Sequence, residues 1–354
     1  AGREKGRGGE KGKRPSVVCR SFSTHSVDPA DNIHMEPIRI ELPLGWSMGS
    51  VNAYLFTQPE VVLVDAGVKS EACREALVDA LAAHGLAVRD IERVVITHPH
   101  VDHFGLAGRI VAESDATVWI CELGAPWLTD PDSMWAGRMA YYQRDLLPAL
   151  GLPSKTNELI LGGLRELATQ ADAVPVGRTV TFRPDGVLQL GGATWQVVHA
   201  PGHACAQTIF YQPETRQLLS ADMLLAVTPA PVIDHPSPGK RREPALPHFM
   251  HSLDMVNALD IGMVFPGHGR PFDDHRAVIA RQRERIAGRK AQCLELISEG
   301  QSTIPELLEI MYAHQPPGSR VAGLWMLIGY LDLLLDEGEI VEDIIADMNH
   351  YHIP

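Results

Sequence analysis

The stretch Thr97-His98-Pro99-His100-Val101-Asp102-His103-Phe104-Gly105 is the most informative part of this sequence. It places three histidines and one aspartate within six positions, directly after the apolar run of residues 93–96, which is typical of a buried strand. Imidazole and carboxylate groups are the ligands that zinc and similar transition metals take in proteins. Side chains alternate along an extended segment, so His98 and His100 are expected to point the same way, and the turn that follows brings the other two donors nearby. The stretch therefore predicts a metal site at the end of a strand.

Three further donors occur where an apolar run ends. His203 follows the run of residues 194–199, Asp222 closes that of residues 217–221, and His268 stands in Phe265-Pro266-Gly267-His268-Gly269. Rigid strands aim such side chains, and the loops after the strands leave them accessible. We expect these residues to join the first cluster.

This ordered set resembles the metallo-β-lactamase superfamily, whose hallmark is H-x-H-x-D-H followed by a histidine, an aspartate and a last histidine. The resemblance covers roughly residues 38–275 and implies an α/β fold, a four-layer αββα sandwich. It implies one metal on His98, His100 and His203, and another on Asp102, His103 and His268. Asp222 would bridge the two metals. Asp65, in Val64-Asp65-Ala66-Gly67, matches the family's early V-D-x-G element and would support the ligands from behind.

The resemblance implies two divalent metal ions, with Zn²⁺ as the first expectation and Fe or Mn as alternatives. Two such ions would activate a bridging water as hydroxide at neutral pH and polarise the bond under attack, so hydrolysis is the expected reaction. Asp102 and Asp222 are the expected catalytic carboxylates, with Asp102 orienting the hydroxide and taking up its proton. Gly45-Trp46-Ser47-Met48-Gly49 fits a nucleophile-elbow pattern, but a strand follows it, so we interpret it as a loop.

Short alternating runs and longer helical patterns divide the chain into parts. Residues 1–34 are expected to be a disordered basic extension, with Met35 as the working start; residues 35–275 form the catalytic domain, with a helical insertion at about 125–173; and residues 276–354 form a C-terminal winged-helix-like domain. Strands are expected at residues 37–42, 52–56, 61–65, 93–96, 117–120, 178–183, 186–190, 194–199, 208–212, 217–221 and 263–265. Helices are expected at residues 71–84, 106–114, 247–259, 276–300, 303–314 and 321–336, with a wing at residues 339–342.

Charge and composition narrow the class of function. The 354 residues carry a formal net charge of −13, and the basic residues are concentrated in the first 20 positions, which hold seven Lys and Arg against two Glu. An acidic body disfavours a long nucleic-acid surface. The five cysteines form no C-x-x-C pair, and we find no apolar run of the length that spans a bilayer. We therefore expect a cytoplasmic protein with reduced thiols and no membrane partner.

We expect the substrate to be a small-molecule thioester or ester, of the acyl-thioester or lactone class, with the apolar insertion as a lid over the acyl group. Four residues outside the metal cluster are candidate substrate contacts: Trp135, Tyr142, His235 and His248. Cys205 is expected to be a small buried thiol. Three alternatives stay open: β-lactamase-like activity, a metal-dependent endoribonuclease or phosphodiesterase, and a non-enzymatic oligomer or redox scaffold with a non-zinc dimetal centre.

The C-terminal helices bear on the nuclease alternative. The expected recognition helix, residues 324–336, contains no Lys or Arg, whereas reading a nucleic-acid groove requires cations and polar groups. We interpret this helix as a packing or dimerising element with Trp325 and Ile328 buried. A nucleic-acid partner is not expected, and a homodimer stays open.

Overall fold

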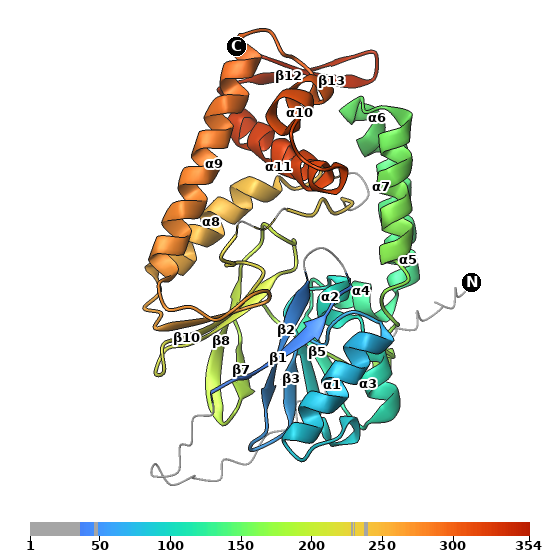
Figure 1. Ribbon diagram of the computed structural model, residues 1–354, viewed down its shortest axis with the longest axis vertical. Helices are drawn as coiled ribbons and strands as arrows, with labels where there is room; N and C mark the ends of the chain where they lie inside the picture. The colour runs from blue at the N-terminus through green and yellow to red at the C-terminus, as the bar shows by residue number, and fades with distance from the viewer. Residues whose placement is uncertain (1–35, 46–48, 228, 230, 237–239) are drawn as a thin grey trace, which may run out of the picture. The chain divides into compact units, whose positions relative to one another are not determined.

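Two large sheets pack against each other in the described chain (Figure 1). The structure, a computed structural model, describes residues 36–45, 49–227, 229, 231–236 and 240–354. The expected extension at residues 1–34 and the centre of the Gly-x-Ser-x-Gly stretch, residues 46–48, lie outside the described residues. Every expected strand is present within two residues of its expected ends.

The first sheet has the order β1-β2-β3-β4-β5-β6 and the second has the order β11-β10-β9-β8-β7. The first sheet consists of β1 (Ile38–Pro43), β2 (Ser50–Phe56), β3 (Val62–Val64), β4 (Arg93–Ile96), β5 (Thr117–Cys121) and β6 (Thr179–Phe182). The second consists of β7 (Val187–Leu190), β8 (Ala193–His199), β9 (Thr208–Gln212), β10 (Gln217–Ala221) and β11 (Met263–Pro266). Strands β3 to β6 are parallel, and so are β10 and β11, whereas β7 to β10 pair antiparallel.

Side chains alternate between the two faces of each buried strand, and this alternation produces the layers of the fold. In β4, Val94 and Ile96 face an apolar cluster with the helices on the outer face of the first sheet, whereas Val95 faces the second sheet. The cluster between the sheets contains the large rings of Trp195 and Phe210. Since successive side chains of a strand point to opposite faces, the wholly buried strands separate two cores. The predicted αββα sandwich is confirmed.

Helices cover the outer faces of both sheets. The first sheet is covered by α1 (Glu71–Ala83), α2 (Val101–Phe104) and α3 (Ala107–Glu113). The second packs against α8 (Ala245–Ala258) and α9 (His275–Ser298) through a third apolar cluster. The stretch expected to be a helical insertion contains α4 (Ala125–Thr129), α5 (Pro131–Tyr141), a π-turn at Tyr142–Leu146, α6 (Leu147–Leu150) and α7 (Ser154–Leu167). Single 3₁₀ turns occur at Val88–Asp90 and Val176–Arg178.

The C-terminal segment contributes to that third cluster. It consists of α10 (Ile304–Tyr312), α11 (Pro317–Asp336) and a hairpin of β12 (Val341–Ile345) and β13 (Met348–His352) that follow α9. Ile328 of α11 is buried as predicted, but Trp325 is only half-buried, with its ring 5.9 Å from that of Tyr142. The last strand was not predicted. The hairpin turn at Ala346 and Asp347 has two positive φ angles without a glycine or asparagine to signal it.

None of the described helices is long and apolar enough to cross a membrane.

Candidate metal centre

The strand directions bring the predicted donors to one edge of the two sheets. The histidine motif follows β4, and His203, Asp222 and His268 follow β8, β10 and β11, which all run in the same direction. The sheets are joined at this edge, because the amide and hydroxyl of Thr208 both donate hydrogen bonds of 2.9 Å to the Thr97 carbonyl. Parallel strands end at the same edge, and the donors therefore meet although they are far apart in the sequence.

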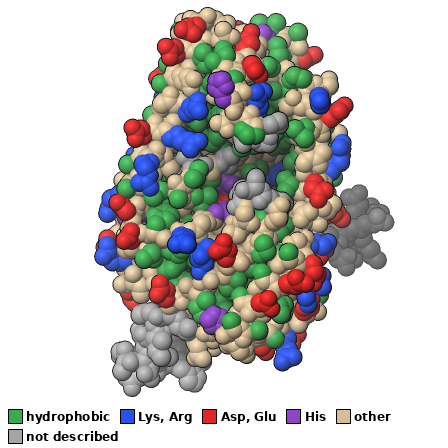
Figure 2. Space-filling view, viewed as in Figure 1, with side chains coloured by type: hydrophobic (Ala, Val, Ile, Leu, Met, Phe, Trp, Pro, Cys, Tyr) green, Lys and Arg blue, Asp and Glu red, His purple; other side chains and the backbone are tan. Residues whose placement is uncertain are grey.

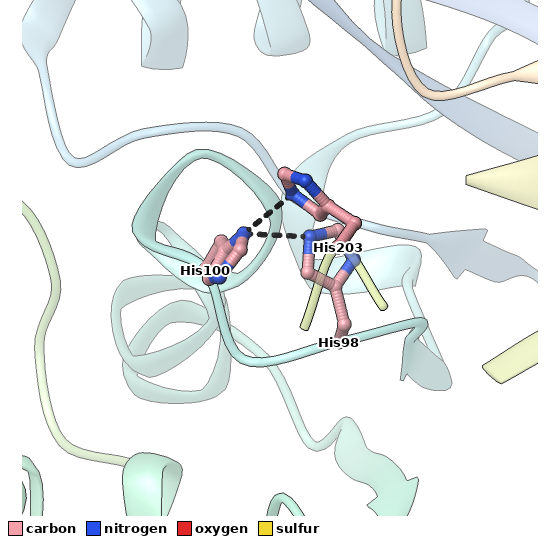
Figure 3. A group of neighbouring side chains, drawn as sticks. All are labelled: His98, His100 and His203. Carbon is pink, nitrogen blue, oxygen red and sulfur yellow. Dashed lines mark hydrogen bonds between the residues drawn. The ribbon is translucent and has the colours of Figure 1, made fainter. Parts of the chain in front are cut away.

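His98, His100 and His203 form the first group of donors. Nδ1 of His100 lies 3.0 Å from Nε2 of His98 and 2.9 Å from Nε2 of His203 (Figure 3). The three rings come from two different loops and turn these nitrogens toward one another. Nitrogens this close together suit the ligands of one small cation.

Asp102, His103 and His268 form the second group. Oδ2 of Asp102 lies 3.4 Å from Nε2 of His268 and 3.9 Å from Nε2 of His103. Asp222 faces both groups, because its Oδ2 is 3.5 Å from Nε2 of His203 and 3.3 Å from Nε2 of His268. The structure thus brings all seven predicted residues together, with Asp222 between the two groups.

Hydrogen bonds behind the rings fix their orientation. Nδ1 of His103 donates to Oδ2 of Asp65 at 2.7 Å, and Nδ1 of His268 donates to the Ser50 carbonyl at 2.7 Å. Asp65 in turn accepts from the amide and hydroxyl of Thr97 at 2.9 Å. When either ring is neutral, the proton on Nδ1 leaves the lone pair on Nε2, on the side of the donor cluster.

The unpaired atoms of the cluster fit a divalent cation. Nε2 of His103, Nε2 of His268 and Oδ1 of Asp222 are buried and have no hydrogen-bond partner among the described residues. Leaving a buried polar atom unpaired costs about 1–3 kcal/mol, so three such atoms in one place call for a common partner. Nitrogen and carboxylate oxygen donors are suited to zinc and similar ions.

The two groups differ in charge when no metal is bound. Burial lowers the pKa of His98 well below its ordinary value and that of His100 to about 3, so both rings are neutral. For His268 burial also opposes the charged form, but the carboxylates of Asp222 and Asp102, both within 3.4 Å of Nε2, outweigh it and raise the pKa to about 10. His103 is raised well above its ordinary pKa in the same way, chiefly by Asp222. The second group is therefore a set of buried ion pairs.

Metal uptake should consequently release protons. His268 must lose its proton to become a ligand, and below about pH 10 it holds that proton in the metal-free protein. We expect the metal affinity to rise roughly tenfold per pH unit for each proton displaced. Calorimetric titration in two buffers with different protonation enthalpies measures the number released; a value of zero at pH 7 would contradict the ion-paired arrangement.

The raised pKa of His268 also affects the stability of the metal-free fold. This stability falls as the pH rises, whereas the metal affinity increases. A raised pKa contributes stability that is complete below the ordinary histidine value of about 6.5 and is lost as the pH rises through the folded value, here about 10 for His268.

Asp65 should control metal affinity without contacting the metal. Replacing it with asparagine removes the charge that holds His103, so we expect metal affinity to fall by roughly 10- to 100-fold while the fold is retained. Asp132→Asn, on an exposed residue of α5, is the matched control and should leave affinity unchanged. Competition with a chromophoric chelator measures both, and equal affinities would refute the role given to Asp65.

The loop that carries His268 is held by residues that the sequence did not single out. Nδ2 of Asn52 donates to the carbonyls of Pro266 and Gly269 at 2.8 Å, and the Tyr54 hydroxyl donates to Pro266 at 2.7 Å. These partners are more than 200 positions away along the chain. No local signal marks Asn52 or Tyr54, since each looks like an ordinary strand residue.

The four predicted substrate contacts lie in different surroundings: two line a cavity, one is half-buried on a helix and one is in the core. His235 and His248 line a cavity of about 310 Å³ beside the cluster. Trp135 is half-buried on α5, 5.5 Å from the ring of Trp127. The prediction for Tyr142 is wrong: its ring is in the apolar core, and its hydroxyl donates to the Ile233 carbonyl at 2.9 Å.

Cys205 also differs from expectation. It is exposed rather than buried and lines the same cavity as His235. Its position two residues after His203, in the turn between β8 and β9, leaves it outside the apolar clusters.

A buried ion pair supports the cavity wall next to His100. Arg138 of α5 pairs with Asp234, and its guanidinium carbon lies 4.2 Å from the centre of the Trp127 ring. The charges of both residues act on the pKa of His100. This pair, which the sequence reasoning missed, connects the helical stretch 125–167 to the metal cluster.

Comparisons with known proteins agree with this geometry. Residues 46–268 match the Metallo-beta-lactamase superfamily. A "Probable metallo-hydrolase" of Bacillus subtilis (strain 168) is 28% identical over 305 residues, 86% of this chain and 93% of that protein. A "Linear primary-alkylsulfatase" of Pseudomonas sp. (strain ATCC 19151) is 24% identical over 260 residues, 70% of this chain and 47% of that protein.

Solved structures show the same fold over nearly the whole chain. A metallo-beta-lactamase family protein from Thermus thermophilus has a TM-score of 0.74 at 24% identity, covering 90% of this chain and 98% of its own. A beta-lactamase domain protein from Burkholderia ambifaria has a TM-score of 0.72 at 23% identity, with coverages of 92% and 98%. The fold, the donor cluster and the match over more than half of the chain together show that this protein belongs to the metallo-beta-lactamase superfamily.

Proposed function

We propose that the protein is a metal-dependent hydrolase of small-molecule esters or thioesters. The observation that carries the proposal is the convergence of seven donors, in two groups that share Asp222, beside a cavity of about 310 Å³. His98, His100 and His203 would hold one divalent cation, and Asp102, His103 and His268 the other, with zinc as the first expectation. When bound, such cations make water nucleophilic at neutral pH and polarise the bond under attack.

The chain's own residues supply orientation and charge. Burial opposes the charged form of Asp102, but His103 and the nearby ring of His268 outweigh it and lower the pKa to about 2. Asp102 is therefore a carboxylate at neutral pH, which can orient a water molecule and assist in moving its proton. Asp65 and the Ser50 carbonyl keep His103 and His268 in position during this step.

The burial of α11 favours a small-molecule substrate over nucleic acid. Residues 327–334 of this helix are all buried, and Gly329 packs so closely on α8 that an added Cβ would lie 2.8 Å from Cβ of Leu246. A helix that reads a groove must present its side chains to the nucleic acid. This observation supports our interpretation of α11 as a packing element.

Metal-replete protein assayed on a substrate panel tests the proposal. The panel holds an aryl ester, an acyl thioester, a lactone, a β-lactam, an alkyl sulfate and RNA, the alkyl sulfate and β-lactam being included because of the names of the relatives. We expect turnover of the ester or thioester that a chelator abolishes and added Zn²⁺ restores. Turnover of RNA alone, or turnover that survives chelation, would overturn the proposal.

A further inference from the structure

Two cavities meet beside the metal cluster. The smaller, of about 310 Å³, is bordered by Gly202 and Cys205 on either side of His203, and by Asp234. The larger, of about 1200 Å³, lies among α5, the segment before α8, α11 and β12. Figure 2 shows a hollow in the middle of the visible face with histidine side chains inside it. A ligand with its reacting bond at the metal cluster would therefore extend from the smaller cavity into the larger one.

The residues shared by the two cavities include two cations and no carboxylate. Both cavities are lined by His235, Pro236, Lys240 and Arg241. Within the described part of the chain, neither Lys240 nor Arg241 has an ion pair or a hydrogen bond. The other two cations of the larger cavity are already paired, Arg144 with Asp145 and Arg242 with Asp332.

The backbone that carries the two unpaired cations is anchored by the next residue. Arg242 donates two parallel hydrogen bonds to Asp332 of α11, at 2.7 Å and 2.5 Å. Such bidentate pairs fix the geometry of both partners, and this one is mostly buried. Lys240 and Arg241 thus precede a fixed point, so ligand binding has to order their side chains but not the backbone at Arg242.

The negative charges around the junction are either paired with an arginine or line only one of the two cavities. Asp234 pairs with Arg138, and Glu243 lines only the smaller cavity. Asp336 and Glu342 line only the larger cavity. The junction itself is therefore positive, although the chain as a whole is acidic. His235 adds a ring nitrogen, Nδ1, that is buried and has no partner among the described residues.

We propose that Lys240 and Arg241 form a subsite for the oxyanion of the substrate. The preferred substrate is then an ester or thioester that carries a carboxylate, sulfate or phosphate group remote from the bond that is cleaved. Guanidinium and ammonium groups bind such oxyanions through charge-assisted hydrogen bonds. This inference rests on the proposed hydrolase function, whose substrate class it specifies.

A pair of esters tests the proposal in the metal-replete protein. 4-Nitrophenyl hemiglutarate carries a carboxylate at the end of its acyl chain, and 4-nitrophenyl pentanoate has a neutral chain of similar length. In the double variant Lys240→Ala/Arg241→Ala, we expect KM for the hemiglutarate to rise roughly tenfold, because both cations are exposed and each contributes modestly, while KM for the pentanoate stays unchanged. The preference for the hemiglutarate should also weaken at high salt.

Arg144→Ala is the matched control. Arg144 lines the larger cavity but is paired with Asp145 and is absent from the junction, so this variant should keep the wild-type KM for both esters. Equal KM changes for the two esters in the double variant, or the same loss in Arg144→Ala, would overturn the subsite.

A binding measurement separates failure of the subsite from failure of the hydrolase proposal. Inorganic sulfate is titrated calorimetrically into the metal-free wild type, the double variant and Arg144→Ala. Sulfate affinity should fall several-fold only in the double variant, and equal affinity in all three would overturn the subsite. If neither ester is hydrolysed, the hydrolase proposal fails, and the sulfate titration still decides whether Lys240 and Arg241 bind an oxyanion.

Discussion

Replacing Asp222 with asparagine should lower hydrolysis by roughly 10³-fold, the upper end of the effect of removing one preorganised electrostatic group. Asp222 has carboxylate oxygens 3.3–3.5 Å from nitrogens of His103, His203 and His268, so it contacts both groups of donors. The amide keeps the shape but loses the charge, and it presents an NH₂ group toward nitrogens that need an acceptor or a cation. Metal retention should fall together with turnover.

The metal-free protein gives an independent check on this variant. Burial opposes the charged form of Asp222, but His103 and His268 hold its pKa well below the ordinary value. Without that carboxylate the two histidines lose their main counter-charge, and their pKa values should fall. NMR titration of the histidines measures this. Asp273→Asn, an exposed aspartate outside the cluster, is the control; an Asp222→Asn variant with wild-type turnover would refute the role of Asp222.

Gly267→Ala should reduce metal binding nearly as much as Asp222→Asn does, although glycine supplies no ligand. A Cβ at this position would overlap Oδ1 of Asp222 and lie 3.0 Å from Cε1 of His103. The backbone cannot move aside easily, because the Gly267 amide donates to the Ala221 carbonyl and its carbonyl accepts from the Asn52 amide, both at 2.7 Å. We expect the methyl group to displace Asp222 and to cost about 1–3 kcal/mol of stability.

The control for this variant is a glycine in open surroundings. Gly288 is exposed in the middle of α9, and a Cβ there would meet nothing within 4 Å. Gly288→Ala should raise stability by up to about 1 kcal/mol and leave metal content unchanged. Thermal unfolding and elemental analysis of both variants test this contrast; a Gly267→Ala protein with full metal content would show that the contact with Asp222 is not essential.

Local patterns predict the strands and, together with the family resemblance, the donors. The run at residues 93–96 is β4 with the same ends. Its four consecutive buried residues, an arginine followed by three apolar residues, are typical of a central parallel strand. Each of the seven donors follows an apolar run, the resemblance to the superfamily groups them into one site, and the structure places them together. The strand depends on neighbouring residues alone, whereas the grouping of the donors also depends on the resemblance.

Features that depend on distant contacts could not be predicted in the same way. No sequence pattern marks Asn52 as part of the site, because its role depends on a contact with β11, a distant part of the chain. The composition of residues 125–173 shows that aromatic residues are present but not which way they face. The sequence therefore predicts a substrate contact at Tyr142, whereas the structure places its ring in the core. The cations Lys240 and Arg241 gain significance only because α11 and β12 complete the cavity around them.

Elemental analysis of the purified chain tests the central claim most directly. We expect two divalent cations per folded wild-type chain, measured by inductively coupled plasma mass spectrometry after dialysis against metal-free buffer, and a clear loss in Asp222→Asn. A wild-type chain that is folded, has been offered Zn²⁺, Fe²⁺ and Mn²⁺, and retains none of them would contradict it.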